Sequence, residues 1–502
     1  VRVAYFVREG KKARIREVAF EGNDALSDRK LKKVVKTKPR RWLLIGGKYD
    51  EQKFEADMRG IIDAYGDVGR MEAEVEATDF DYVDNGKKLK ITIYLDEGPE
   101  YSVEDMTVAD NFVFDNAELD EIIEIRGGDV HNRGQVISDA ETVQKLYSDS
   151  GYINARVTPR VTLDRDEKTT NIVHDVDEGD LKYIRELKIT GNSITRDDVI
   201  RRQLVLQPGD RFDGGALRRS QNRVNSLRYF DDIRFTVQDV DENPLFTDLL
   251  LDVEEGQTGN FNFGGGFSTD ESYILFAELS LRNFDITDWP TFSGGGQQFS
   301  IRTSLGDERQ FFNISFTDPE IGGVPIALGF DLFNESYRSR GGSDYEQRTR
   351  GAQLRFGKSL SEFTTIRMFL AYRDVDIDNI DQFVLPIYDE LLDPEATFST
   401  SFAISRDTTD DFRDPTRGWE NTFGVALAGL ADNEFVKLSQ DTTVYRGLTK
   451  DGTWVVSQRL RSDVGWAFGD REFIPLQERL FAGGSTTIRG YETRDVGPKA
   501  LD

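Results

Sequence analysis

An acidic residue followed by glycine recurs along the first half of the chain, and this recurrence constrains the fold more than any other feature. The pairs lie roughly 80 residues apart, at Glu9-Gly10, Glu97-Gly98, Glu178-Gly179 and Glu255-Gly256. Before each pair apolar and polar residues alternate, as they do over 89–95. Such alternation is typical of a half-buried strand. A near-constant period predicts a row of similar small modules rather than one large domain.

The same five elements are predicted in each module, in the order β-α-α-β-β. The first strand leads to a turn such as Gly22-Asn23, because Gly and Asn tolerate the positive φ that tight turns require. Ser27 or Thr195 is the expected cap of the first helix. The second helix carries one apolar stripe, which includes Phe54 and Ile61 in the first module.

These patterns predict α+β modules at 15–97, 98–179 and 180–256, with the end of a preceding module at 1–14. A generic array of small α+β domains is the alternative, but the order, the spacing and the segment that follows make it less favoured. Both ends of the chain resemble cut ends, so we expect a fragment of a longer protein.

After Gly256 the helical periodicity disappears and strand follows strand. Phe299, Ile301 and Leu305 share one face of a segment whose other face carries Arg302 and Ser304. A soluble β-sandwich also alternates, but an Arg at the lipid midplane costs roughly 2–4 kcal/mol whereas a wet lumen accepts it. We therefore predict an antiparallel transmembrane β-barrel at 257–502. It is incomplete, with about eleven strands, and an even count of roughly 16 is expected if the barrel closes.

Composition excludes several classes of function. The formal net charge is −27, which argues against nucleic acid as a partner, because nucleic-acid binding needs a basic surface. The chain has no cysteine, and its two histidines, His131 and His174, lie in no motif. A nucleophile elbow, a P-loop and a metal cluster are all missing from the sequence. We therefore predict no catalytic residues, no metal site and no cofactor, and a protein that is not an enzyme.

The most specific motif lies near the end of the chain. It comprises Gly483, Gly484, Ile488, Arg489, Gly490 and Tyr491. With Gly497-Pro498-Lys499 after it, this motif resembles the sixth-loop signature of the BamA family of outer membrane protein assembly factors. The resemblance implies that the barrel segment 257–502 ends in the sixth extracellular loop. The modules upstream are similar to POTRA domains, the polypeptide-transport-associated repeats of the periplasm. The segments 313–319 and 414–418 resemble periplasmic turns of the same family.

The resemblance extends to the first barrel strand. Its residues are Asn260, Phe261, Asn262, Phe263, Gly264, Gly265, Gly266 and Phe267. In the family this strand pairs weakly with the last one and forms a lateral gate, and glycines weaken a strand interior. The alternative is that these glycines only make room for bulky lumen residues. The resemblance also implies that Arg489 folds into the lumen and meets acidic groups on later strands, which we expect after Asp502.

The implied function is the assembly and insertion of β-barrel proteins into the outer membrane without ATP, with the POTRA domains in the periplasm receiving clients and the gate templating their strands. The implied partners are unfolded outer membrane proteins, periplasmic chaperones, accessory lipoproteins of a barrel assembly complex and the lipid bilayer. A TamA-type or two-partner secretion barrel is the nearest alternative. A passive porin is less favoured, because porins lack both the repeats and the loop motif.

Overall fold

The computed structural model describes residues 13–39, 47–240, 243–268, 272–307, 309–339, 345–378, 395–411, 414–449, 453–469, 471–484, 487–491 and 496. The predicted end of a preceding module at 1–14 lies outside these residues except for its last two positions. Ser485, Thr486 and the segment 497–499 of the predicted loop also lie outside them. Among the described helices, none combines the length and the hydropathy that crossing a bilayer requires.

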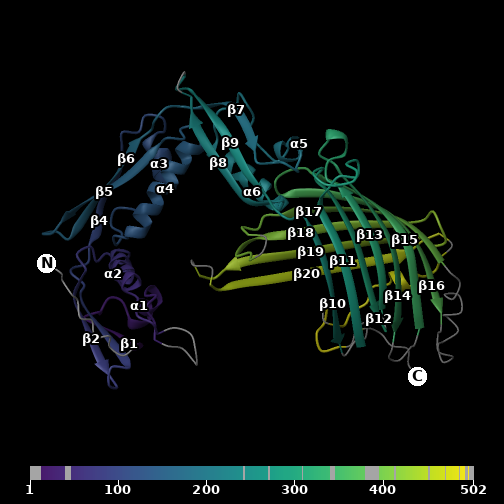
Figure 1. The fold of residues 1–502 in the computed structure, drawn as a ribbon, viewed down its shortest axis with the longest axis horizontal. Coiled ribbons are helices and arrows are strands. Elements are labelled where there is room, and N and C mark those ends of the chain that lie inside the picture. The colour runs from purple at the N-terminus through teal and green to yellow at the C-terminus, as the bar shows by residue number, and fades with distance from the viewer. Residues whose placement is uncertain are drawn as a thin grey trace, which may run out of the picture. The chain divides into compact units, whose positions relative to one another are not determined.

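Three repeats of the same topology occupy the first half of the chain (Figure 1). The first contains β1 (Arg14–Glu21), α1 (Asp28–Val34), α2 (Glu51–Gly66), β2 (Glu74–Val83) and β3 (Lys88–Asp96). The second contains β4 (Ser102–Ala109), α3 (Asn116–Ile122), α4 (Arg133–Asp149), β5 (Arg156–Asp164) and β6 (Thr169–Asp177). The third contains β7 (Tyr183–Thr190), α5 (Asp197–Arg201), α6 (Gly214–Leu227), β8 (Phe230–Asp239) and β9 (Phe246–Glu255).

Each repeat forms a three-stranded sheet in which the last strand lies in the middle. The orders are β1-β3-β2, β4-β6-β5 and β7-β9-β8, and the first strand runs parallel to the last in the first two repeats. The central strand is therefore the most buried, as Ile91 and Ile93 of β3 show by being fully covered. Ile61 and Tyr65 of α2 lie in the same core. The predicted β-α-α-β-β order is confirmed.

The glutamate of each acidic-Gly pair binds the loop that precedes the first helix of its repeat. Glu97 accepts hydrogen bonds from the Ala25 N–H at 2.8 Å and from the Tyr65 hydroxyl at 2.9 Å. Gly22 lies beside the same strand end at φ 84°, and a Cβ there would stand 2.2 Å from the Leu95 carbonyl oxygen. The recurring Glu thus binds the same loop in each repeat, whereas the turn that carries Gly22 in the first repeat and Gly191 in the third has Asp110 in the second.

The helix caps differ from those predicted. Ser27 occupies the N-cap position of α1, but its side chain makes no capping hydrogen bond. The prediction of Thr195 as a cap is wrong, because Arg196 is the N-cap of α5. The Thr195 hydroxyl donates to Glu255 at 3.0 Å instead. The Thr195 hydroxyl therefore forms a tertiary hydrogen bond in place of a local capping bond.

Eleven strands form one antiparallel sheet in the second half of the chain, and Figure 1 shows them side by side in sequence order. They are β10 (Gly259–Ser268), β11 (Ser272–Phe284), β12 (Gln297–Gly306), β13 (Arg309–Asp318), β14 (Ala327–Ser339), β15 (Tyr345–Ser359), β16 (Thr364–Asp378), β17 (Glu395–Asp407), β18 (Arg417–Ala428), β19 (Phe435–Gly447) and β20 (Val455–Ala467). Two short 3-10 helices, η2 (Ile321–Gly323) and η4 (Leu476–Glu478), lie in connections. The predicted fold class is confirmed.

The chain divides into two compact units. One contains most of the three repeats, and the other contains the eleven-stranded sheet together with 189–203 and 224–233 of the third repeat. The contacts between this part of the third repeat and the sheet therefore lie inside one unit.

Candidate functional site

The eleven-stranded sheet has one apolar face built by cross-strand register. Leu279 pairs with Ile301, and Ile301 pairs in turn with Ile314 on the next strand. Farther along the sheet, Leu438 pairs with Val464. Because partners in an antiparallel pair point to the same side, these pairs join into one apolar surface. That surface is suited to lipid, as the sequence predicted.

The opposite face of the sheet is charged and internally paired. Arg302 lies 2.8 Å from Glu278 on the neighbouring strand. Arg355 lies 2.6 Å from Asp331 and also donates to the Ser315 hydroxyl at 2.9 Å. Two hollows of about 380 and 730 Å³ lie on this face and are lined largely by such polar side chains. A face of paired charges and hydroxyls suits a water-filled lumen.

The predicted gate strand, β10, forms one edge of the sheet and pairs with β11. Phe261, Phe263 and Phe267 of this strand are exposed, and the first two rings lie 5.9 Å apart. The strand therefore offers an apolar side and a free backbone edge in the part of the sheet that the structure describes. Such an edge is a template for another strand.

The gate glycines fall into two groups. A Cβ on Gly264 would stand 2.8 Å from the ring of Phe276, and a Cβ on Gly265 would stand 2.9 Å from Leu275. Gly264 makes room for Phe276 on the charged face, as the alternative explanation required, whereas Leu275 beside Gly265 belongs to the apolar face. Gly266 has no such neighbour within 4 Å, so its lack of a side chain weakens the strand without a packing reason.

The predicted sixth-loop residues form a tight turn. Gly483 and Gly484 have φ of 110° and 91°, and Gly490 has φ of 95°, so all three adopt the left-handed region that favours glycine. The Thr487 hydroxyl donates to the Gly483 carbonyl at 2.7 Å, and the Gly484 N–H donates to the Tyr491 carbonyl at 3.1 Å. The sequence prediction had given no role to Thr487, which closes this turn.

The two residues that follow Thr487 carry the apolar and the charged side chain of the motif. Ile488 and Arg489 are both exposed. Arg489 makes no ion pair with any residue in the described part of the chain. The predicted acidic partner of Arg489 stays a prediction.

Glu478 binds the base of the sixth loop to the polar face of the sheet, and the sequence analysis did not identify it. Its carboxylate lies 3.1 Å from Arg373 of β16 and also forms an ion pair with Lys437 of β19. The Lys437 ammonium additionally donates to the Glu478 carbonyl at 3.1 Å. Glu478 belongs to no motif, and its partners Arg373 and Lys437 lie far away in sequence, so only the fold reveals its role.

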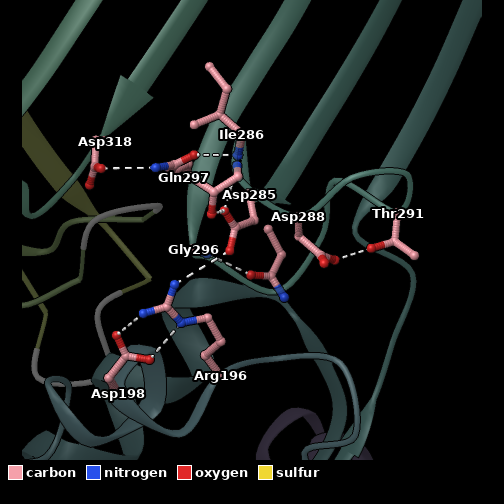
Figure 2. Close-up of polar contacts among 11 residues, drawn as sticks. Arg196, Asp198, Asp285, Ile286, Asp288, Thr291, Gly296, Gln297 and Asp318 are labelled. Carbon is pink, nitrogen blue, oxygen red and sulfur yellow. Dashed lines mark hydrogen bonds and ion pairs between the residues drawn. The ribbon is translucent and has the colours of Figure 1, made fainter.

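A second site missed by the sequence joins the third repeat to the sheet. The amide of Asn283 donates to the Thr195 hydroxyl at 2.8 Å, and its carbonyl oxygen accepts from the Gly296 N–H at 2.9 Å. Arg196 forms an ion pair with Asp285 at 3.5 Å, and Figure 2 shows the two side chains facing each other. Asn283 and Asp285 are nearly inaccessible to solvent, so these contacts are part of a closed interface.

Two further contacts extend the interface. The Tyr229 hydroxyl donates to the Arg282 carbonyl at 2.8 Å, and burial raises the pKa of Tyr229 to about 12, which keeps it protonated as a donor. Burial alone would raise the pKa of Asp285, but hydrogen bonds from Thr287 and the charge of Arg196 hold it below its ordinary value. Asp285 is therefore a carboxylate that pairs with Arg196.

A metal site is not part of this arrangement. Among the residues that the structure describes, there is no cluster of three or more His, Asp or Glu side chains that could hold a metal ion.

Comparison with family models places known domains on both halves of the chain. Residues 13–98, 101–179 and 182–256 match the POTRA family, described as a surface antigen variable number repeat. Residues 292–502 match the Omp85 superfamily domain.

Individual relatives match nearly the whole chain. The chain is 26% identical to the outer membrane protein assembly factor BamA of Neisseria meningitidis serogroup B, over 99% of this chain and 64% of the relative. It is 27% identical to the BamA of Nitratidesulfovibrio vulgaris, over 98% of this chain and 61% of the relative. The chain thus spans less than two thirds of these relatives.

A solved structure supports the fold. The structure of BamA from Haemophilus ducreyi lacking POTRA domains 1–3 superposes with a TM-score of 0.59 at 21% identity, covering 79% of this chain and 77% of that one.

Proposed function

We propose that this chain, which belongs to the Omp85 superfamily, assembles β-barrel proteins into the outer membrane. The proposal starts from its POTRA repeats, which precede an outer membrane barrel. The observation that carries the proposal is the combination of a POTRA array with an antiparallel sheet that has one apolar face and one charged face. The relatives named as BamA are assembly factors, and the same activity is proposed here.

The energy for this assembly comes from the client rather than from ATP. An unfolded barrel protein gains backbone hydrogen bonds when its strand adds to an exposed sheet edge. The outer strands β2 and β5 of the first two repeats offer such edges in the periplasm. The repeats would therefore receive clients, along with the chaperones that deliver them and the lipoproteins that complete a barrel assembly complex.

The lateral gate is proposed at β10, over Asn260–Phe267. Its pairing with β11 is continuous in register, and the gate is proposed between its other edge and the last strand of the barrel. Gly266, which has no packing neighbour, lowers the stability of that strand, and an incoming client strand would then pair with the free edge. Gate opening would also disturb the adjacent bilayer and lower the barrier to insertion.

The sixth loop is proposed to stabilise the lumen side of the barrel. The guanidinium of Arg489 is always charged and can bind a carboxylate through two hydrogen bonds, and Gly490 allows the tight backbone beside it. Glu478 supports this role, because its ion pairs with Arg373 and Lys437 hold the start of the loop on the charged face.

The test is depletion of the full-length protein, followed by complementation. Depletion should leave many different outer membrane proteins unfolded in the periplasm, and unchanged barrel assembly would refute the proposal. Arg489→Ala should restore assembly less well than Arg461→Ala, a matched change on the polar face, where Arg461 pairs with Asp463 at 2.8 Å. Equal and negligible effects of both variants on assembly would contradict the proposed role of the sixth loop.

The same experiment separates assembly from secretion. A two-partner or TamA-type barrel would lose one exported partner, or a small set of them, on depletion. A broad loss of unrelated barrel proteins would therefore favour assembly.

A further inference from the structure

We propose that the turn 285–296, which joins β11 to β12, is an interfacial anchor whose Trp289 and Ile286 side chains lie in the periplasmic leaflet of the outer membrane. The occupant of this surface is the boundary between lipid headgroups and acyl chains. This placement is additional to the assembly function, and either can fail without the other.

A chain of aromatic rings leads from the sheet into the turn. Phe284 stacks on Phe299 at 5.2 Å between centroids, and its edge contact with Phe316 is at 6.3 Å. On its other side Phe284 stacks on Phe292 at 5.6 Å. Trp289 then meets Phe292 edge-on at 5.2 Å. The rings thus form one continuous cluster, which begins on the strands and ends at Trp289.

The start of this cluster belongs to the lipid-facing surface. Phe299 pairs with Phe316 across β12 and β13, next to the pair formed by Ile301 and Ile314. These residues continue the apolar face described above. The aromatic cluster therefore extends that face beyond the strand ends, on the side of the barrel where the third repeat attaches. That side is periplasmic, since POTRA repeats lie in the periplasm of the relatives.

The outer end of the cluster is uncovered although the turn is well braced. Trp289 is 79% exposed and Ile286 is 58% exposed. The turn itself is held by hydrogen bonds from Thr287 to Asp285 at 2.6 and 2.9 Å, and by the Ile286 N–H, which donates to the Gln297 side chain at 2.9 Å (Figure 2). A braced turn that presents a Trp and an Ile outward is typical of an interaction surface.

Lipid is the occupant that the chemistry favours. Trp concentrates at membrane interfaces because its ring is apolar while its N–H can still donate to a headgroup or to water. Trp289 adjoins a surface already assigned to lipid, and its indole nitrogen has no hydrogen-bond partner among the described residues. Both properties match the headgroup boundary.

The end of β11 and the polar side of the same turn bind the third repeat. Asn283 and Asp285 bind Thr195 and Arg196, and the Arg196 N–H donates to the Gly294 carbonyl at 3.0 Å. A turn fixed in the leaflet by Trp289 would therefore set the depth at which this part of the third repeat is held. It would do so beside β11, the strand that pairs with the proposed gate.

The test locates the Trp289 ring in the bilayer. The full-length protein and its Trp289→Phe variant are inserted into liposomes, and the difference between their fluorescence spectra isolates the emission of Trp289. Phospholipids brominated near the headgroup should quench most of this emission. Phospholipids brominated near the chain ends should quench it less, and aqueous iodide should lose access to it when the protein moves from detergent to liposomes.

Two controls define the scale. Trp466, on the apolar face of β20, should also be quenched by brominated lipid, as the difference with Trp466→Phe would show. A Trp placed in the first repeat by Tyr82→Trp should be quenched by iodide alone. Unchanged heat-dependent gel mobility would show that the variants fold. Quenching of Trp289 by iodide but not by lipid, or stronger quenching by deep than by shallow bromine, would overturn the anchor.

Discussion

The repeats and the barrel sheet are built from similar alternating strands, but their apolar side chains differ in location. In the repeats they are buried in a protein core, and in the sheet they lie on the outer surface. In the first repeat Ile91 and Ile93 are fully buried under helices. In the sheet Leu460 and Val464 of β20 are more than half exposed, while Arg459 on the other face pairs with Asp441. Alternation therefore specifies two faces, and the presence or absence of an amphipathic helix nearby decides whether protein or lipid covers the apolar one.

A second comparison concerns the third repeat and its two predecessors. In the second repeat Glu178 accepts from the Tyr147 hydroxyl at 2.9 Å, as Glu97 does from Tyr65. In the third repeat Glu255 instead binds Thr195, whose hydroxyl also accepts from Asn283 of the sheet. In the third repeat the corresponding loop therefore also binds the sheet. The fold of the repeat is the same, and only the hydrogen-bond partners of the loop differ.

The largest predicted effect tests whether lipid covers one face of the sheet and water the other. Leu460→Arg places a charge in the middle of the lipid-facing side of β20, and we expect the free energy of unfolding to fall by about 2–4 kcal/mol. Urea unfolding of the full-length protein in liposomes would measure it. The matched control is Ser457→Arg on the polar face, which should change stability little. Equal losses for both variants would contradict the assignment of the faces.

The next prediction tests whether Glu178 holds the loop of the second repeat in place. Glu178→Ala removes the acceptor for the N–H groups of Phe112 and Val113 and for the Tyr147 hydroxyl. Leaving such groups without partners costs about 1–3 kcal/mol, so hydrogen exchange should accelerate in the second repeat. Glu167→Ala, an exposed glutamate on the turn between β5 and β6, is the control. Unaltered exchange in the Glu178 variant would show that the loop is closed by other contacts.

A pH dependence should distinguish the second repeat from the first. Both histidines of the chain, His131 and His174, are fully buried there, and burial lowers the pKa of each. The unfolded repeat then binds protons more readily than the folded one. Stability is therefore complete above the ordinary His pKa of about 6.5 and falls as the pH drops below it, by up to about 1.4 kcal/mol per pH unit for each group.

The measurement is the urea midpoint of each repeat, read from peptides in hydrogen exchange after correction for the intrinsic rate. The first repeat contains no histidine and provides the internal control. A second repeat that is equally stable at about pH 7 and about pH 5 would show that protonation is accommodated in the core.

The smallest predicted effects come from single hydroxyl groups. Tyr147→Phe and Tyr229→Phe each remove one hydrogen-bond donor, for an expected loss of about 0.5–1.5 kcal/mol. The location should differ, because Tyr147 bonds within its own repeat whereas Tyr229 bonds to the Arg282 carbonyl of the sheet. Hydrogen exchange should therefore accelerate in the second repeat for one variant and over 282–296 for the other. The same pattern in both variants would contradict the docking role of Tyr229.

The alternation and period of the sequence predicted the element order and the two faces of the sheet, since both follow from which side chains avoid water. They could not predict Glu478, because its partners Arg373 and Lys437 lie far away in sequence. The prediction of Thr195 as a helix cap was wrong for a related reason. Capping is a local preference, and a buried bond to Glu255 with a further bond from Asn283 outweighed it.

The sequence by itself determined that the chain is a row of β-α-α-β-β repeats followed by antiparallel strands with one apolar and one charged face, because these features depend on short-range periodicity. Only the tertiary structure decided which charges pair across that face, and that Asn283 and the turn 285–296 join the third repeat to the sheet. The physical reason is that ion pairs, buried hydrogen bonds and aromatic stacking depend on distances between residues remote in sequence, which strand register and loop geometry alone set.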